Sequence, residues 1–285
     1  MKMKKSGFFV LLTVPILLLC QCQKENESEN YDANLDVARS STLANSIFSN
    51  VYKVFHQAFY DTVLHSAGSK DICGANVMYL TYPGDSVVIR AVYPDWNLLC
   101  PDGIYRRGII NAWIKEPFSD SSGKAEFTFT NFAIENNELT GDYKIMYEAD
   151  SNQKPLYQSV AKEVEISMFD SVNSMQWEAH QKVFWAEGSE TPQDFSDDLF
   201  LYSGTNSGVS ESGLPFSSEI VEPIKKDRLC TWLKGGSFIV RSPDLDIAEG
   251  MVYFTEDSCN DLFYMEFQGI QFYERFKYLY IQKPL

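Results

Sequence analysis

Three carboxylates follow one tryptophan within a short stretch of the chain. They are Glu187, Asp197 and Asp198, and the tryptophan is Trp185. Paired carboxylates perform acid–base chemistry on glycosidic bonds, and an aromatic ring offers an apolar face to a sugar. This stretch is therefore the best candidate for a ligand-binding or carbohydrate-active site. A solvated acidic loop beside a core tryptophan is the preferred interpretation, because carboxylates without a cleft do not indicate catalysis.

The chain offers few groups for nucleophilic catalysis or metal binding. It has three histidines, His56, His65 and His180, and no Gly-x-Ser-x-Gly or Cys-x-x-Cys sequence. His56 and His65 are expected on opposite sides of one helix, since nine residues turn a helix by about 180° beyond full turns. We therefore expect no enzymatic activity, no metal and no cofactor.

Two acidic turns carry the oxygen ligands that calcium prefers. They are Asp244-x-Asp246-x-x-Glu249 and Asp194-x-x-Asp197-Asp198. Neither matches an EF-hand loop, so ordinary acidic turns are the preferred interpretation. The only arginine pair, Arg106-Arg107, is interpreted as neutralising nearby carboxylates, with a partner contact as the alternative.

Residues 1–21 have the features of a secretory signal. Lys2, Lys4 and Lys5 precede a mostly apolar run of thirteen residues, Gly7 to Leu19. Such a run covers roughly 20 Å as a helix, less than the ~30 Å of a bilayer's hydrocarbon core. It is therefore not expected to span a membrane.

Two thiols at the end of this leader suggest lipid attachment. The run from Leu17 to Cys22 resembles a lipobox, whose cysteine is acylated, and Gln23 to Glu27 is similar to the surface-export signal of Bacteroidota lipoproteins. We expect acylation at Cys22, with Cys20 as the alternative because neither follows a small residue. An ordinary secretory signal is the remaining alternative. The resemblance implies a lipid-anchored protein of the outer membrane, exposed at the cell surface, or alternatively facing the periplasm.

Besides Cys20 and Cys22 the chain has four cysteines, an even number that predicts disulfides in an exported protein. Local pairs are favoured among the three possible pairings. Cys230 and Cys259 are symmetric about Asp244-Leu245, so they are expected to face each other across an antiparallel hairpin. Cys73 and Cys100 bracket a second hairpin turning at Pro83-Gly84-Asp85.

The charge of the chain argues against polyanionic partners. Its net charge is −15, and removal of residues 1–21, with three lysines and no acids, lowers it to −18. Such a surface repels nucleic acid, so no nucleic-acid partner is expected.

The remaining sequence predicts one helix followed by one β domain. Residues 22–33 are polar and predict a disordered tether. Residues 34–68 carry an apolar stripe of helical period that ends at Gly68, expected to pack on a sheet. Residues 69–285 alternate apolar and polar residues between turn signals, as at Met175, Trp177 and Ala179. The expected fold is all-β with one N-terminal helix, an antiparallel meander forming a sandwich or an open curled barrel.

Scattered residues in this domain resemble a group of uncharacterised Bacteroidota envelope lipoproteins. They include Asp102-Gly103, Gly108, Gly141, Trp185-Ala186-Glu187-Gly188, Thr191, Asp197-Asp198, Gly204, Gly208, Gly213, Cys230-Thr231-Trp232 and Cys259-Asn260. The resemblance covers about residues 70–275, and it implies an all-β fold in the envelope and no catalytic residues. One departure is Glu256-Asp257-Ser258-Cys259, which lacks glycine. By their residue types alone, Gly204, Gly208 and Gly213 predict a flexible loop among serines.

Together these features predict a non-catalytic, lipid-anchored binding or interaction protein of the cell envelope. Its expected partners are the membrane, through the anchor, and a glycan or another envelope protein. One alternative is a carbohydrate-active hydrolase that uses Glu187 with Asp197 or Asp198 near Trp185. The other is a purely structural envelope component.

Overall fold

The structure is a computed structural model. It describes residues 25–84, 86–115, 123–149, 154–167, 174–245, 249–256 and 259–277. The predicted leader, both candidate lipid-attachment cysteines and Asp246 lie outside the described residues. None of the described helices is long and apolar enough to cross a membrane.

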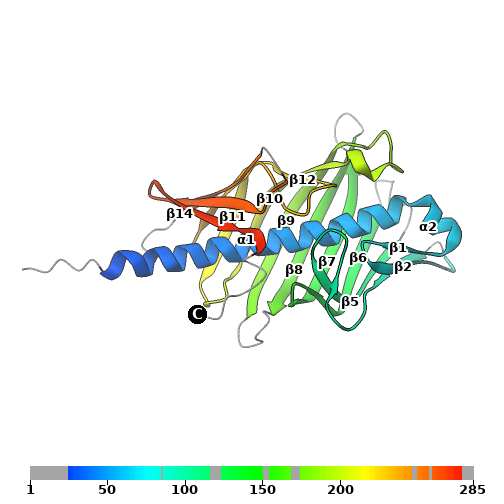
Figure 1. The fold of residues 1–285 in the computed structure, drawn as a ribbon, viewed down its shortest axis with the longest axis horizontal. Coiled ribbons are helices and arrows are strands. Elements are labelled where there is room, and N and C mark those ends of the chain that lie inside the picture. Colours follow the sequence, from blue (N-terminus) through cyan, green and yellow to red (C-terminus); the bar gives the residue numbers. More distant parts are fainter. Residues whose placement is uncertain are drawn as a thin grey trace, which may run out of the picture.

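One antiparallel sheet forms most of the molecule and curls without closing (Figure 1). Its strands follow the order β1-β2-β3-β5-β6-β7-β8-β9-β10-β11-β13-β14-β15-β16, while β4 pairs with β5 and β12 with β10. The expected all-β fold with one main N-terminal helix is therefore confirmed. The strands are β1 Ser69–Ile72, β2 Ala75–Tyr82, β3 Ser86–Val92, β4 Leu98–Leu99, β5 Tyr105–Lys115, β6 Lys124–Ile134, β7 Asn137–Ala149, β8 Pro155–Ser167, β9 Ser174–Glu187, β10 Leu199–Val209, β11 Pro215–Glu222, β12 Ile224–Asp227, β13 Ser237–Arg241, β14 Glu249–Phe254, β15 Leu262–Phe267 and β16 Ile270–Arg275.

Helix α1, Glu25–Tyr60, lies along the inner face of this sheet (Figure 1). It contacts strands from β1 to β15. It begins earlier than expected, because residues 25–33, part of the predicted tether, are helical. The predicted single helix is also divided: Asp61 caps the short helix α2, Thr62–Ala67, and accepts a bond from the Leu64 amide. Gly68 ends α2 with a φ of 75°, as the sequence predicts.

The core lies between α1 and the inward-facing residues of the strands. Phe48 of α1 stacks on Trp177 of β9 with ring centroids 4.6 Å apart, and both are buried. Each large apolar side chain buried this way contributes about 1.5–3 kcal/mol. Polar residues of α1 are buried too: Asn45 accepts a 2.7 Å hydrogen bond from Gln181 of β9. The sheet thus buries polar residues of α1 as well as its apolar stripe.

Two glycines of β10 bring this strand unusually close to β9. A Cβ atom at Gly204 would lie 2.3 Å from the carbonyl oxygen of His180, and one at Gly208 would lie 2.1 Å from that of Gln176. The predicted flexible loop is therefore wrong at these two positions, which are paired strand residues. Only Gly213, with a φ of 86°, lies in a turn.

One of the two predicted disulfides is present. Cys230 and Cys259 are bonded, with Cα atoms 5.3 Å apart. Cys230 lies in the turn after β12 and Cys259 in the loop between β14 and β15, so the bond joins two loops at the open end of the β13–β14 hairpin, whose register pairs Arg241 with Glu249. The other prediction is wrong, since Cys73 and Cys100 are free thiols. Register explains the miss: β2 and β3 pair Asn76 with Val92, so continuation of the ladder would not bring residue 100 opposite residue 73.

Candidate functional site

Three polar regions of the described structure are candidates for function. The first is the acidic stretch singled out by sequence. Glu187, Asp197 and Asp198 line one hollow of about 480 Å³ at the ends of β9 and β10. Its other lining residues are Ser196, Leu199, Lys225, Asp227, Lys234 and Glu256. The structure therefore brings the three predicted carboxylates together, within a mixed-charge hollow.

Trp185 does not offer a surface to a ligand. Its side chain is only 1% exposed, so it cannot stack on a sugar as the hydrolase hypothesis requires. Its indole Nε1 instead donates a 2.8 Å hydrogen bond to Asp198 Oδ1. Trp185 is therefore a core residue, as the preferred interpretation held, but the expected solvated loop is wrong at Asp198, which is 2% exposed.

Asp198 is buried beside His56 of α1. Its Oδ2 lies 3.8 Å from His56 Nδ1. Burial raises the pKa of Asp198 to about 7, although the Trp185 hydrogen bond acts in the opposite direction. Burial, with the nearby charge of Arg228, lowers the pKa of His56 to about 3. Both groups are therefore neutral in mildly acidic solution, and their contact is not an ion pair there.

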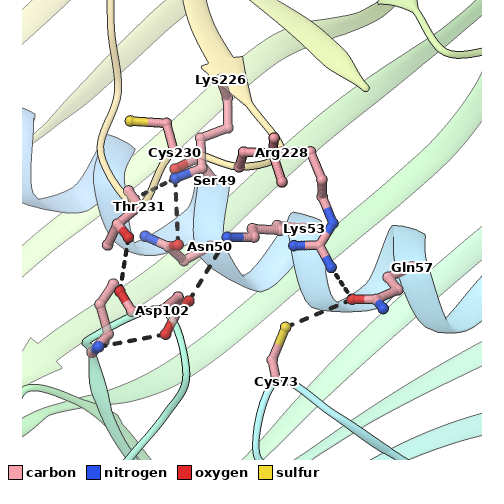
Figure 2. A network of polar contacts seen from close by, with 12 residues as sticks. Ser49, Asn50, Lys53, Gln57, Cys73, Asp102, Lys226, Arg228, Cys230 and Thr231 are labelled. Atoms are coloured by element: carbon pink, nitrogen blue, oxygen red, sulfur yellow. Dashed lines mark hydrogen bonds and ion pairs between the residues drawn. The ribbon is translucent and has the colours of Figure 1, made fainter. Parts of the chain in front are cut away.

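The second region, which we call the cationic network, lies where β5, β12 and their loops meet α1 (Figure 2). It consists of Lys53, Arg106, Lys226, Arg228 and the single carboxylate Asp102. Arg106 is 1% exposed and forms two hydrogen bonds to Asp102, of 2.7 and 2.8 Å. Lys53 Nζ lies 3.8 Å from the same carboxylate. Among the described residues, no other carboxylate forms an ion pair with these four cations.

Neutral oxygens surround the other two cations. Lys226, buried, donates to Asn50 Oδ1 at 3.4 Å and to the Thr231 carbonyl oxygen. Arg228 donates to Gln57 Oε1. The Asn50 contact ties β12 to α1, the Thr231 contact ties β12 to the loop that follows it, and the Gln57 contact ties that loop to α1. The Cys230–Cys259 disulfide begins in the same loop.

The charges of this network shift its pKa values. Burial, followed by the charge of Arg228, lowers the pKa of Lys53. Burial and the charge of Lys53 lower that of Lys226 well below its ordinary value. Burial opposes ionisation of Asp102, but the hydrogen bonds and charge of Arg106 outweigh it and hold the pKa of Asp102 below its usual value.

The third region, which we call the outer groove, crosses the face of the sheet opposite α1. It consists of two adjoining hollows of about 450 and 300 Å³ that share Glu178 and Ser207. Cross-strand pairing places their polar residues side by side, as Ser207 pairs with Glu178 on one side and Ser217 on the other. The exposed polar residues are Glu163, Glu165, Gln176, Glu178, His180, Thr205, Ser207, Ser217, Glu219 and Arg241.

The outer groove was not predicted from the sequence, although the residue types at the outward strand positions indicate it. Where the groove lies, the outward positions of β9, β10 and β11 carry mostly polar side chains, and those of Ser207 and Ser217 are short. Cross-strand pairing places Ser207 next to Ser217, so short side chains adjoin one another between the longer ones.

The three histidines lie in three different places. His56 is in the core, His65 of α2 stacks on Tyr79 with ring centroids 4.0 Å apart, and His180 is exposed in the outer groove. The arginine pair neutralises carboxylates as expected, since Arg107 lies 3.1 Å from Glu138. Among the described residues no three histidine, cysteine, aspartate or glutamate side chains form a metal-binding group.

Comparisons with known proteins add no identity. No protein-family model, no curated protein and no solved structure matches the chain. The resemblance to Bacteroidota envelope lipoproteins therefore stays a prediction, and the function is inferred from the chain itself.

Proposed function

We propose that this protein is a non-catalytic, lipid-anchored binding module of the cell envelope whose outer groove binds a neutral glycan. The supporting observation is the groove itself, two adjoining hollows on exposed strand faces that combine polar side chains with apolar surface. Its hydroxyl, carboxylate, imidazole and guanidinium groups supply the donors and acceptors that sugar hydroxyls require. Four of its side chains are glutamates, so an anionic polymer would be repelled.

Variants on the groove test this proposal. Glu178→Ala removes the carboxylate shared by both hollows, and Ser207→Tyr fills the space between them. We expect each to weaken binding of a neutral oligosaccharide by at least about tenfold, the cost of one hydrogen bond to a charged group. A glycan array identifies the oligosaccharide, and calorimetry measures its affinity.

The matched control is Thr128→Tyr, which adds the same ring at an exposed position of β6. It should leave the affinity unchanged. A blank array with folded protein would overturn the proposal, and altered envelope integrity on deletion would then favour the structural alternative.

The proposed anchor rests on the leader sequence. Labelling with a fatty-acid analogue should mark the wild-type chain and the Cys20→Ser variant, whereas Cys22→Ser should lose the label. Protease treatment of intact cells should remove the protein, because we place it on the outer surface of the outer membrane. An unlabelled protein found free in the medium would rule out the anchor.

A carbohydrate-active hydrolase at the acidic hollow is the second candidate. It is favoured by one observation, the pKa of about 7 at Asp198, which suits a general acid. It is disfavoured because Asp198 is buried and its oxygens face Trp185 and His56. Turnover of glycosidase substrates that Glu187→Gln and Asp198→Asn both abolish would establish this activity and overturn the non-catalytic proposal.

A further inference from the structure

The cationic network contains more positive charge than its partners compensate. Asp102 pairs with Arg106 and Lys53 only, while Lys226 and Arg228 contact neutral oxygens, and the bidentate contact with Arg106 occupies both oxygens of Asp102. Uncompensated charges in a low-dielectric interior are costly. This surplus is buried in a chain whose net charge is −15, so a general basic character of the protein does not explain it.

Two of the cations also have unused hydrogen-bond donors. Lys53 is 4% exposed, and its Nζ lies 3.8 Å from Asp102 Oδ2, beyond hydrogen-bonding distance. Arg228 Nε is buried and has no hydrogen-bond partner among the described residues. A buried donor such as Arg228 Nε ordinarily has an acceptor.

These donors belong to neighbouring side chains. In Figure 2 the Lys53 ammonium is directed toward Asp102 and the Arg228 guanidinium toward Gln57, and the charge of Arg228 lowers the pKa of Lys53, so the two cations are near one another. Arg228, Gln57 and Cys73 are each partly exposed, and Leu229 beside them is 75% exposed. Solute therefore has a route to this end of the network, whereas Lys226 and Arg106 lie deeper.

We infer that the cationic network binds one small oxyanion between Lys53 Nζ and the Arg228 guanidinium. The recognised group is a phosphate, sulfate or carboxylate, as a free ion or carried by an acidic monosaccharide. Arg228 presents a planar set of N–H groups suited to paired oxygens, and Lys53 adds a point charge. Gln57 supplies a further donor once its amide rotates. The site is separate from the outer groove and does not depend on glycan binding there.

Binding of three solutes to the full chain tests the inference. Calorimetry at constant ionic strength measures inorganic phosphate, glucuronate and uncharged glucose. We expect saturable binding of phosphate, of glucuronate or of both, and none of glucose. Phosphate alone would indicate a free ion, and glucuronate alone a sugar acid.

Variants locate the site. Lys53→Met and Arg228→Gln should each weaken the bound oxyanion by at least about tenfold, since each removes a charged hydrogen bond. The control is Lys225→Met, which removes an equal charge from the residue preceding Lys226, where Lys225 pairs with Glu256 at 2.8 Å. It should bind as the wild type does. Circular dichroism verifies folding, and Arg228→Gln, at a half-buried position, serves alone should Lys53→Met unfold.

Three outcomes would overturn the inference. One is the absence of saturable oxyanion binding to the wild type. Another is equal binding by all variants, which would place the anion elsewhere. The third is an equal loss in Lys225→Met, which would show an effect of overall charge only.

Discussion

Two aspartates, the partly buried Asp102 and the buried Asp198, lie next to helix α1 at positions about one turn apart, and their pKa values shift in opposite directions. Asp102 lies 3.8 Å from Lys53, and Asp198 lies 3.8 Å from His56. The pKa of Asp102 is lowered, while that of Asp198 is raised to about 7. Burial disfavours ionisation at both positions, so burial cannot explain the difference.

The difference arises from the partners that surround each carboxyl group. Asp102 receives two hydrogen bonds from a guanidinium, whereas Asp198 receives one from a neutral indole. A full positive charge in contact compensates the desolvation of a carboxylate, and one neutral donor does not. In adjacent turns, the same helix thus contacts a charged region around Asp102 and a second region, which we call the neutral region, formed by Asp198 and His56.

Removal of the Asp102 charge should have the largest effect on stability. In Asp102→Asn the buried guanidinium of Arg106 loses its only carboxylate among the described residues. We expect the free energy of unfolding to fall by about 3–5 kcal/mol, the usual cost of leaving a buried charge unpaired. Urea unfolding at pH 7 measures it.

The double variant Asp102→Asn with Arg106→Met should recover part of this loss, because it removes both charges. Glu249→Gln is the control, since its exposed carboxylate pairs with Arg241 at 2.8 Å and exposed pairs contribute little. Asp102→Asn could instead lower the free energy of unfolding by no more than the control does. That result would show that the cationic network needs no carboxylate.

Loss of the disulfide that joins Cys230 to Cys259 should have the next largest effect on stability. Reduction, or Cys230→Ser with Cys259→Ser, should lower the free energy of unfolding by roughly 3–4 kcal/mol through loop entropy. The sequence separation is 29 residues. Cys73→Ser should lack this effect, because the Cys73 thiol is free. Mass mapping of the unreduced chain should find Cys230 joined to Cys259, and another partner would contradict the hairpin register.

Sequence alone predicted the elements whose periodicity is simple. Alternation located the strands because their inner and outer faces differ in polarity along most of their length, as β9 shows. The start of α1 was missed because its first residues are polar, and tertiary contacts such as Tyr31 against Phe272 stabilise that part of the helix. The Cys73–Cys100 pairing failed because symmetry about a turn does not fix which residues continue the ladder.

The candidate site was predicted only in part. Glu187, Asp197 and Asp198 do share a hollow, but contact of Asp198 with His56 joins distant segments and has no local signal. Buried lysines were missed because lysine is ordinarily exposed. The alternation in β12 nevertheless indicates one buried lysine, because Lys226 lies on the same strand face as the buried Ile224.

The neutral region should reveal two opposing pH dependences. The pKa of Asp198 is about 3.9 in the unfolded chain and about 7 in the folded protein. Its contribution to the free energy of unfolding is therefore present below pH 4 and is lost as the pH rises to 7. The folded pKa of His56 is about 3 against ~6.5 unfolded. Its contribution is present above pH 6.5 and is lost as pH falls towards 3.

Single variants separate these contributions. Between pH 4 and 7, the free energy of unfolding of Asp198→Asn should fall on acidification, because of the two groups only His56 remains. The free energy of unfolding of His56→Gln should fall on alkalinisation, because of the two groups only Asp198 remains. Each change should be roughly 2–4 kcal/mol in urea unfolding. The wild type should vary less than either variant, and parallel profiles in all three proteins would contradict the assignment.

The smallest effect concerns the one hydrogen bond that favours ionised Asp198. Trp185→Phe removes the indole donor, so the pKa of Asp198 should rise further, by roughly one unit. Carbon-13 NMR of the aspartate carboxyl groups follows this titration directly. Trp113→Phe is the matched control, because Trp113 is 46% exposed on β5 and should leave the pKa unchanged. A fall in the pKa in Trp185→Phe would show that water reaches the carboxyl group when the indole is removed, and that the ring acts by excluding solvent more than by donating its proton.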